Sequence, residues 1–151
     1  MHILKKNFQL SVFALITAVA LATTGCSTMG GDSAQAKSSV TQLSGAQEVP
    51  PVTTEATGQS TIKIGADKSV SGMLIVSRIN ATAAHIHLGA KGANGPVIVP
   101  LTKTSDTTFV VPADAKLTDE QHASYKAGNL YLNVHSAAHP GGEIRAQLSP
   151  K

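Results

Sequence analysis

Cysteine and aromatic residues are scarce in this chain of 151 residues, and tryptophan is absent. The single cysteine, Cys26, excludes an intramolecular disulfide and a metal site built from several thiolates. Beyond the first 25 residues the only aromatic rings are Phe109, Tyr125 and Tyr131, too few for a surface that stacks bases or sugars. A length of 151 residues favours one domain, and aliphatic packing must stabilise it.

Basic charge is scarce as well once the N-terminal segment is set aside. The chain has 12 Lys and Arg residues against 9 Asp and Glu residues. Two of the 12, Lys5 and Lys6, precede the first apolar run, which leaves 10 against 9 in the rest of the chain. Nucleic acids and anionic membrane surfaces attract concentrated positive charge, so this balance argues against both as partners.

The first 25 residues have the pattern of an export signal. Two lysines precede an apolar run over residues 8–21, which is shorter than the roughly 20 residues that span a bilayer. Thr24 and Gly25 before Cys26 resemble a lipobox, although Thr23 stands where the usual pattern has Leu. We predict a lipoprotein signal peptide over residues 1–25, with diacylglycerol and acyl lipid on Cys26, and no transmembrane helix in the mature chain. The alternative is ordinary secretion with an incidental free cysteine.

The residues after the cysteine predict where the protein is held. Ser27, rather than Asp, follows Cys26, which resembles sorting to the outer membrane. We therefore expect a cell-envelope protein, anchored to the membrane by its lipid and facing the periplasm. Residues 26–39 are rich in Ser, Gly and Ala and predict a flexible tether, with a β-domain over residues 40–151.

From residue 40 onward, short β-type runs alternate with turn residues, as in an all-β sandwich. The predicted strands are residues 40–43, 58–64, 70–79, 83–88, 97–101, 107–111, 130–135 and 143–148. One short helix is predicted between them, because Thr118 can act as its N-cap and Gln121 completes a capping box. Gly128 suits the C-terminal end of that helix.

Period-two alternation places three histidines away from the core. In the strand 130–135, Leu130, Leu132 and Val134 share one face, so His135 and Asn133 lie on the other. The same alternation turns His85 and His87 away from the apolar face of the strand 83–88. Alternation does not reveal whether these two strands are neighbours.

Four motifs together resemble the CHRD domain, first named from chordin and common in bacterial exported proteins. They are LSGAQEVPPV at 43–52, AHIHLG at 84–89, GANGPV at 92–97, and LYLNVHS at 130–136 followed by HPGGEIR at 139–145. The resemblance covers about residues 40–149 and implies an immunoglobulin-like β-sandwich or barrel. The His-x-His pair also resembles the copper-binding pair of the Cu,Zn superoxide dismutases, which have a similar Greek-key sandwich. Neither resemblance defines a reaction.

The histidines are the main candidates for chemistry. His85 and His87 lie two apart on a strand and can ligate one ion together. Adding His135, and with less support His139, gives three or four neutral nitrogen donors, a set that suits copper or zinc. The alternative is that these are exposed polar residues, with His139 in a turn before Pro140.

Other polar residues have weaker assignments. Asn133 and Glu143 are candidates for orienting an imidazole, but a solvated sheet face is the favoured interpretation of both. Arg145 is interpreted as a rim charge, and Glu48 as the one ionisable residue of a rigid edge segment over residues 43–52. No nucleophile-elbow or phosphate-loop motif occurs, so we do not expect an enzyme.

We therefore predict an exported, lipid-anchored protein that binds a transition metal, with copper favoured and zinc as the alternative. Its predicted ligands are His85, His87, His135 and His139. The competing prediction is a metal-free module of the cell envelope that binds a protein partner or has a structural role. Convergence of the imidazoles in space would favour the metal, and separation of the two histidine motifs would favour the module.

The lipid anchor predicts a specific effect of the substitution Cys26→Ser. Without the thiol, the precursor should remain unprocessed or the protein should be released without lipid. Metabolic labelling with a fatty acid measures this directly: label on the wild type and none on the variant is the expected result. A wild type that takes up no label would contradict the lipoprotein prediction.

Overall fold

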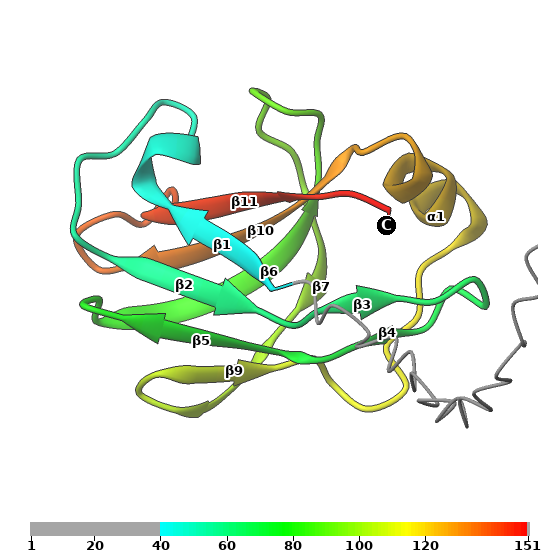
Figure 1. Ribbon diagram of the computed structural model, residues 1–151, viewed down its shortest axis with the longest axis horizontal. Coiled ribbons are helices and arrows are strands. Elements are labelled where there is room, and N and C mark those ends of the chain that lie inside the picture. Colours follow the sequence, from blue (N-terminus) through cyan, green and yellow to red (C-terminus); the bar gives the residue numbers. More distant parts are fainter. Residues whose placement is uncertain (1–39, 151) are drawn as a thin grey trace, which may run out of the picture. The chain divides into compact units, whose positions relative to one another are not determined.

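The computed structural model describes residues 40–150 of the chain. Cys26, the predicted signal peptide and the predicted tether lie outside these residues, so the boundaries proposed for them stay predictions. The described part is an all-β domain with one short α-helix, as expected (Figure 1).

Eleven strands, one 3-10 helix and one α-helix make up the described residues. The strands are β1 (Thr41–Ser44), β2 (Thr57–Ser60), β3 (Lys63–Ile64), β4 (Val70–Ser71), β5 (Met73–Ser77), β6 (Ala81–Leu88), β7 (Val97–Pro100), β8 (Thr102–Ser105), β9 (Thr108–Val110), β10 (Leu130–Ser136) and β11 (Ile144–Leu148). The helices are η1 (Gly45–Gln47) and α1 (Asp119–Lys126).

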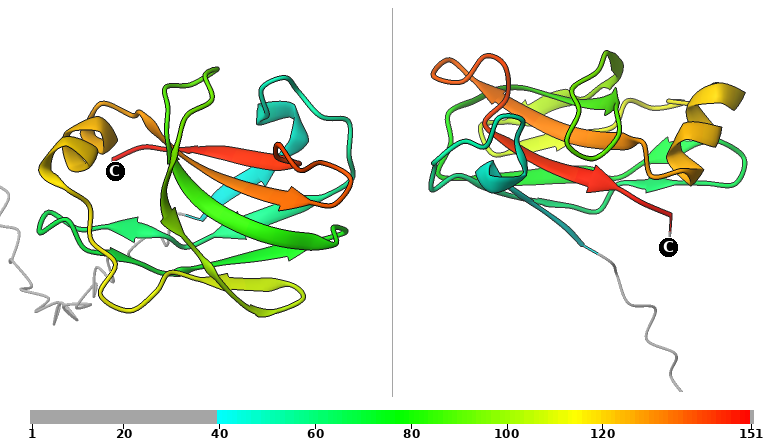
Figure 2. Two further views of the ribbon diagram at one scale, coloured as in Figure 1. Left: turned by 180° about the vertical axis from the view of Figure 1, so that it is seen from behind. Right: turned by 90° about the horizontal axis from the view of Figure 1, so that it is seen from above.

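Nine of the strands form a single antiparallel sheet that curls into a barrel-like sandwich (Figures 1 and 2). Its strand order is β7-β6-β10-β11-β1-β2-β5-β9-β8, and β3 and β4 form a separate hairpin. Strands distant in sequence are neighbours in this order: β6 pairs with β10, and β1 pairs with both β2 and β11. The two histidine motifs therefore lie on adjacent strands.

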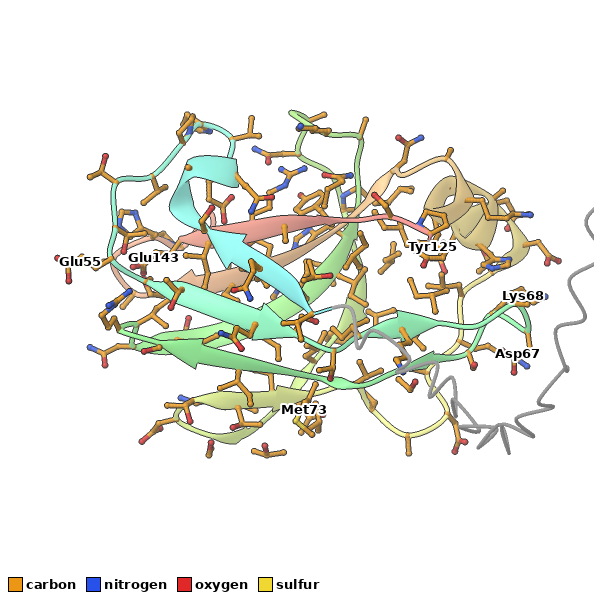
Figure 3. The ribbon with its side chains drawn as sticks, in the orientation of Figure 1. Glu55, Asp67, Lys68, Met73, Tyr125 and Glu143 are labelled. Carbon is orange, nitrogen blue, oxygen red and sulfur yellow. The ribbon has the colours of Figure 1, made fainter. Side chains whose placement is uncertain are left out.

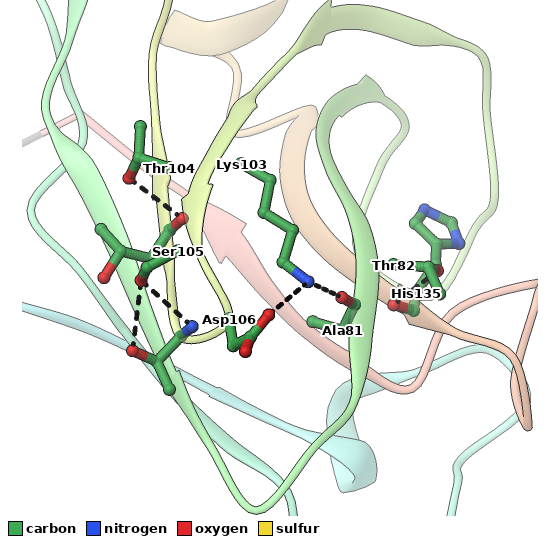
Figure 4. Close-up of polar contacts among 9 residues, drawn as sticks. Ala81, Thr82, Lys103, Thr104, Ser105, Asp106 and His135 are labelled. Carbon is green, nitrogen blue, oxygen red and sulfur yellow. Dashed lines mark hydrogen bonds and ion pairs between the residues drawn. The ribbon is translucent and has the colours of Figure 1, made fainter.

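The two ends of the sheet meet where β7 continues into β8. Leu101, between these strands, donates its N–H to the carbonyl of Ala84 at 2.9 Å. From β8, the Nζ of Lys103 donates to the carbonyl of Ala81 on β6 at 2.9 Å and lies 3.4 Å from Oδ1 of Asp106 (Figure 4). These contacts join the two edge strands to β6 and nearly close the barrel.

The differences from the predicted strands have local causes. The predicted strand 70–79 is divided at Gly72, whose φ of 112° interrupts the extended backbone between β4 and β5. Strand β8 was not predicted because all four of its residues are exposed and polar, so no apolar alternation marks it. The predicted helix is confirmed as α1, and both halves of the capping box between Thr118 and Gln121 are present.

The predicted core face is confirmed, but the opposite face of the same strands is not solvated. Leu130, Leu132 and Val134 are fully buried on the inner face of β10. Tyr131 and Asn133, on the outer face, are also buried. The outer face is covered by two loops, residues 45–52 and residues 89–96, which stand side by side in Figures 1 and 2 and are joined by a hydrogen bond from Asn94 Nδ2 to the Val49 carbonyl.

Burial of Leu132 predicts a large loss of stability in Leu132→Ala. Truncating a fully buried leucine removes apolar contacts and leaves a cavity, which costs on the order of 2–5 kcal/mol in the free energy of unfolding. Chemical denaturation measures that free energy. Ile75→Ala is the matched control, because Ile75 is 51% exposed and its loss should cost about 1 kcal/mol or less. Equal losses in the two variants would mean that the faces are assigned wrongly.

Candidate metal centre

The pairing of β6 with β10 brings three histidines to one place. The strands are antiparallel, with His85 opposite Asn133 and His87 opposite Tyr131. His85, His87 and His135 therefore project from the same outer face of two adjacent strands. Shifts in strand register occur beside two of them, between His135 and Ser136 and between Ile86 and His87. Such irregularities redirect side chains locally and are frequent near functional sites.

The three imidazoles are close enough to hold one ion. Each offers one nitrogen, and these three atoms all lie within 4.8 Å of one another. The Nδ1 of His85 is 3.1 Å from the Nε2 of His135. Two nitrogens bound to one ion at about 2.0–2.1 Å would be about 2.8–3.4 Å apart in square-planar or tetrahedral geometry. The observed separation falls inside that interval.

Main-chain carbonyls fix the protonation of two of these rings. The Nδ1 of His87 lies 2.9 Å from the carbonyl oxygen of Gly95, and the Nδ1 of His135 lies 3.0 Å from that of Pro140. A carbonyl only accepts, so each Nδ1 carries a proton, and in the neutral ring the lone pair is then on Nε2. The Nε2 of His87 is buried and has no hydrogen-bond partner. A buried, unpartnered lone pair in a group of imidazoles fits a metal ligand.

The surroundings favour the neutral imidazole, which is the form that binds metals. Burial lowers the pKa of His85 below its usual value of 6.5, and the neighbouring His135 and His87 lower it further. Burial also lowers the pKa of His87; the hydrogen bond with Gly95 opposes this, while His135 and Arg145 add to it. Protons therefore compete with a metal at these two rings only in more acidic solution than for a free histidine.

Three of the four predicted ligands come together, and His139 does not join them. Among the described residues, the candidate metal-binding group consists of His85, His87 and His135 alone. The main chain of His139 is bound within the turn after β10: its N–H donates to Ser136 Oγ at 3.2 Å, and its carbonyl accepts from Gly142 at 3.0 Å. His139 lies in the turn between β10 and β11, outside this group, so its place among the ligands stays a prediction.

Asn133 and Glu143 are placed differently from either expectation. Both are buried, so neither belongs to a solvated face. Asn133 donates to the carboxylate of Glu48, with distances of 2.8 and 3.0 Å. Glu143, at the end of the barrel where β10 turns into β11 (Figure 3), accepts from Thr54 and Ser136. The imidazoles of His87 and His135 are oriented by the carbonyls of Gly95 and Pro140 instead.

Arg145 was interpreted as a rim charge, and this is wrong. It is only 1% exposed and is the largest of the fully buried side chains. Its Nη atoms donate to the carbonyls of Ala90 and Ala93 and to Oδ1 of Asn94, all in the 89–96 loop. Alternation within a strand carries no information about loops that cover its outer face, so the sequence did not reveal this burial.

Glu48 is the second residue whose role the sequence did not reveal. It is 5% exposed, and burial raises the pKa of its carboxyl to about 7, although Arg145, the Val49 N–H and Asn133 all act to lower it. A Cβ at position 142 would lie 2.9 Å from Oε1 of Glu48 and 2.5 Å from Nδ2 of Asn133. Gly142, with a φ of 131°, is therefore required where the β10–β11 turn crosses this pair.

The raised pKa of Glu48 predicts a pH-dependent stability. The folded state holds the proton up to about pH 7, whereas the unfolded state releases it near 4.5, so stability falls as pH rises between these values. Glu48→Gln keeps the shape without the charge. The free energy of unfolding of this variant, relative to that of the wild type, should therefore rise by on the order of 3 kcal/mol between pH 4.5 and pH 8.

Urea denaturation at several pH values measures this difference. Glu55→Gln is the control, because Glu55 is exposed and its replacement should leave the pH profile close to that of the wild type. If the difference in free energy of unfolding between Glu48→Gln and the wild type were the same at every pH, the prediction would be wrong. Ionisation of Glu48 would then not destabilise the folded state.

Comparison with known proteins agrees with the motifs. The family model of the CHRD domain matches residues 39–148, which is more than half of the chain and nearly all of the described domain. No curated protein and no solved structure matches the chain. The four motifs identified in the sequence lie within these residues and contain all three clustered histidines, Glu48 and Arg145. The chain belongs to the CHRD domain family.

Proposed function

We propose that this protein binds a transition metal ion outside the cytoplasm through His85, His87 and His135, with copper as the favoured metal and zinc as the alternative. The observation that carries the proposal is the convergence of three nitrogen donors within 4.8 Å. Imidazole nitrogens suit copper and zinc, whereas magnesium and calcium prefer oxygen. Copper is favoured because it forms the more stable complexes with nitrogen donors of this kind.

The arrangement of the ligands supports a built site rather than a chance cluster. Two of the three rings have their proton held by a main-chain carbonyl, which leaves the other nitrogen ready for a metal. The contact between His85 Nδ1 and His135 Nε2 requires a proton on one of the two nitrogens. Metal binding would replace that proton, and His85 would then carry its proton on Nε2.

Binding, rather than catalysis, is the function we propose. Buffering, sequestration or delivery of the ion each needs only a site of suitable affinity. The alternative of a metal-free interaction module would be favoured by separated histidine motifs, and the motifs are adjacent. The geometry therefore supports the metal site over the module.

A lipid anchor in the cell envelope is part of the same proposal. CHRD domains are typical of extracellular and envelope proteins, and the signal pattern ending at Cys26 supports attachment through a lipid on that residue. None of the helices in the described part of the chain is long and apolar enough to cross a membrane. We propose the periplasmic side of the outer membrane as the location, from the serine that follows Cys26.

Calorimetric titration of the full chain with Cu(II) and Zn(II) tests the proposed site. Single replacement of His85, His87 or His135 by alanine should weaken binding by about 100-fold or more, since each removes one of three ligands. His122→Ala, on α1, and His139→Ala should bind as the wild type does. Binding should weaken only below about pH 6.5, because the pKa values of His85 and His87 are lowered.

The pattern across the variants decides the outcome. If the His85 and His135 variants bind as tightly as the His122 variant, the three imidazoles do not form the site, and the metal-free module becomes the better account. If the His139 variant is as weak as the other three, the ligand set is the four-histidine set that the sequence predicted.

A further inference from the structure

Tyr131 is enclosed between a proposed metal ligand and a buried arginine. The ring of Tyr131 stacks on that of His87, with centroids 4.8 Å apart and an angle of 11° between the planes. The Cζ of Arg145 lies 3.4 Å from the centroid of the same tyrosine ring. Strand β10 lies between β6, which carries His87, and β11, which carries Arg145, so the two neighbours approach the ring from opposite sides.

The buried guanidinium is held without an acidic partner at ion-pair distance. Within residues 40–150 the ion pairs are Lys68–Asp119 and Lys103–Asp106. The Nη atoms of Arg145 instead donate to the loop carbonyls of Ala90 at 3.3 Å and Ala93 at 2.9 Å and to Oδ1 of Asn94 at 3.1 Å, with a further contact to Oε1 of Gln147 at 3.4 Å. Burying a cation among neutral acceptors is costly, so this arrangement calls for an explanation beyond packing.

Arg145 and Tyr131 together fix the loop that contacts the metal site. The hydroxyl of Tyr131 accepts the N–H of Gly95 at 3.0 Å and donates to the carbonyl of the same residue at 3.4 Å. The carbonyl of Gly95 in turn accepts from Nδ1 of His87 at 2.9 Å. A Cβ at position 95 would lie 1.7 Å from the carbonyl oxygen of Leu88, so only glycine allows the loop to come this close to β6.

We propose that Arg145 and Tyr131 are positioning residues of the metal site. Arg145 holds residues 90–94, Tyr131 holds Gly95, and the Gly95 carbonyl keeps the proton of His87 on Nδ1, so that Nε2 faces His85 and His135. The stack with Tyr131 fixes the plane of the His87 ring. This inference rests on the proposed metal-binding function, but its central claim concerns the metal-free protein and can be tested there.

The tautomer of His87 in the metal-free full chain is the direct readout. Imidazole nitrogen chemical shifts distinguish a proton on Nδ1 from one on Nε2. We expect the wild type to carry it on Nδ1 alone. Tyr131→Phe removes the hydroxyl contact with Gly95 but keeps the ring, and Arg145→Lys keeps the charge but not the three loop contacts; both should give a mixture of tautomers.

Two matched controls separate positioning from general effects of these substitutions. Tyr125→Phe removes a hydroxyl that donates to Ser149 beside α1, at the other end of the barrel from Glu143 (Figure 3). Arg78→Lys alters an exposed arginine that donates to the Glu55 carbonyl. Both controls should keep the wild-type tautomer of His87.

Titration with Cu(II) completes the test. Tyr131→Phe and Arg145→Lys should lose about 10- to 100-fold in affinity, while the two controls lose none. If the wild type binds no metal but the tautomer shifts as expected, the proposed function fails and the positioning stands. If the wild type binds metal and both variants keep the tautomer and the affinity, Arg145 and Tyr131 only stabilise the fold, and this inference is overturned.

The wild type alone also decides the question if Arg145→Lys does not fold. A proton found on Nε2 of His87 in the metal-free wild type would contradict the proposal without any variant.

Discussion

The antiparallel pairing of β6 with β10 is the interaction on which the site depends. Its register sets His85 opposite Asn133 and His87 opposite Tyr131, and it places His135 on the same outer face. A slip of one residue would turn the histidines of β6 towards the core and expose Ile86, which is fully buried. The apolar face of these strands therefore fixes the histidine cluster, because packing of the core and alignment of the ligands require the same register.

Burial of both faces of β10 and β11 imposes a second constraint. On the outer face, polar side chains must find partners because the 45–52 and 89–96 loops exclude water from them. Arg145 donates to carbonyls of the 89–96 loop. Glu48, in the 45–52 loop, accepts a hydrogen bond from Asn133. Within residues 40–150, two buried side-chain polar atoms have no hydrogen-bond partner, the Nε2 of His87 and the Oδ1 of Asn133. A metal ion at the proposed site would give the first a partner, and a proton retained by Glu48 would provide a donor near the second.

Alternation, capping and turn residues were sufficient to predict the all-β fold, the short helix and the side of each strand on which the histidines lie. They were insufficient for Arg145 and Glu48, because alternation within a strand says nothing about loops that fold over its outer face. The same limit explains why Asn133 was interpreted as solvated. His139 was included with the ligands because it shares a motif with His135, but in the described residues the converging nitrogens are those of His85, His87 and His135.

The central claim is that three imidazoles bind one metal ion, and X-ray absorption spectroscopy of the full chain loaded with one equivalent of Cu(II) tests it most directly. The account predicts a nitrogen shell at about 2.0–2.1 Å with the outer-shell scattering of three histidine rings, reduced to two rings in His135→Ala. A spectrum with one imidazole or none, or one that His135→Ala leaves unchanged, would contradict it.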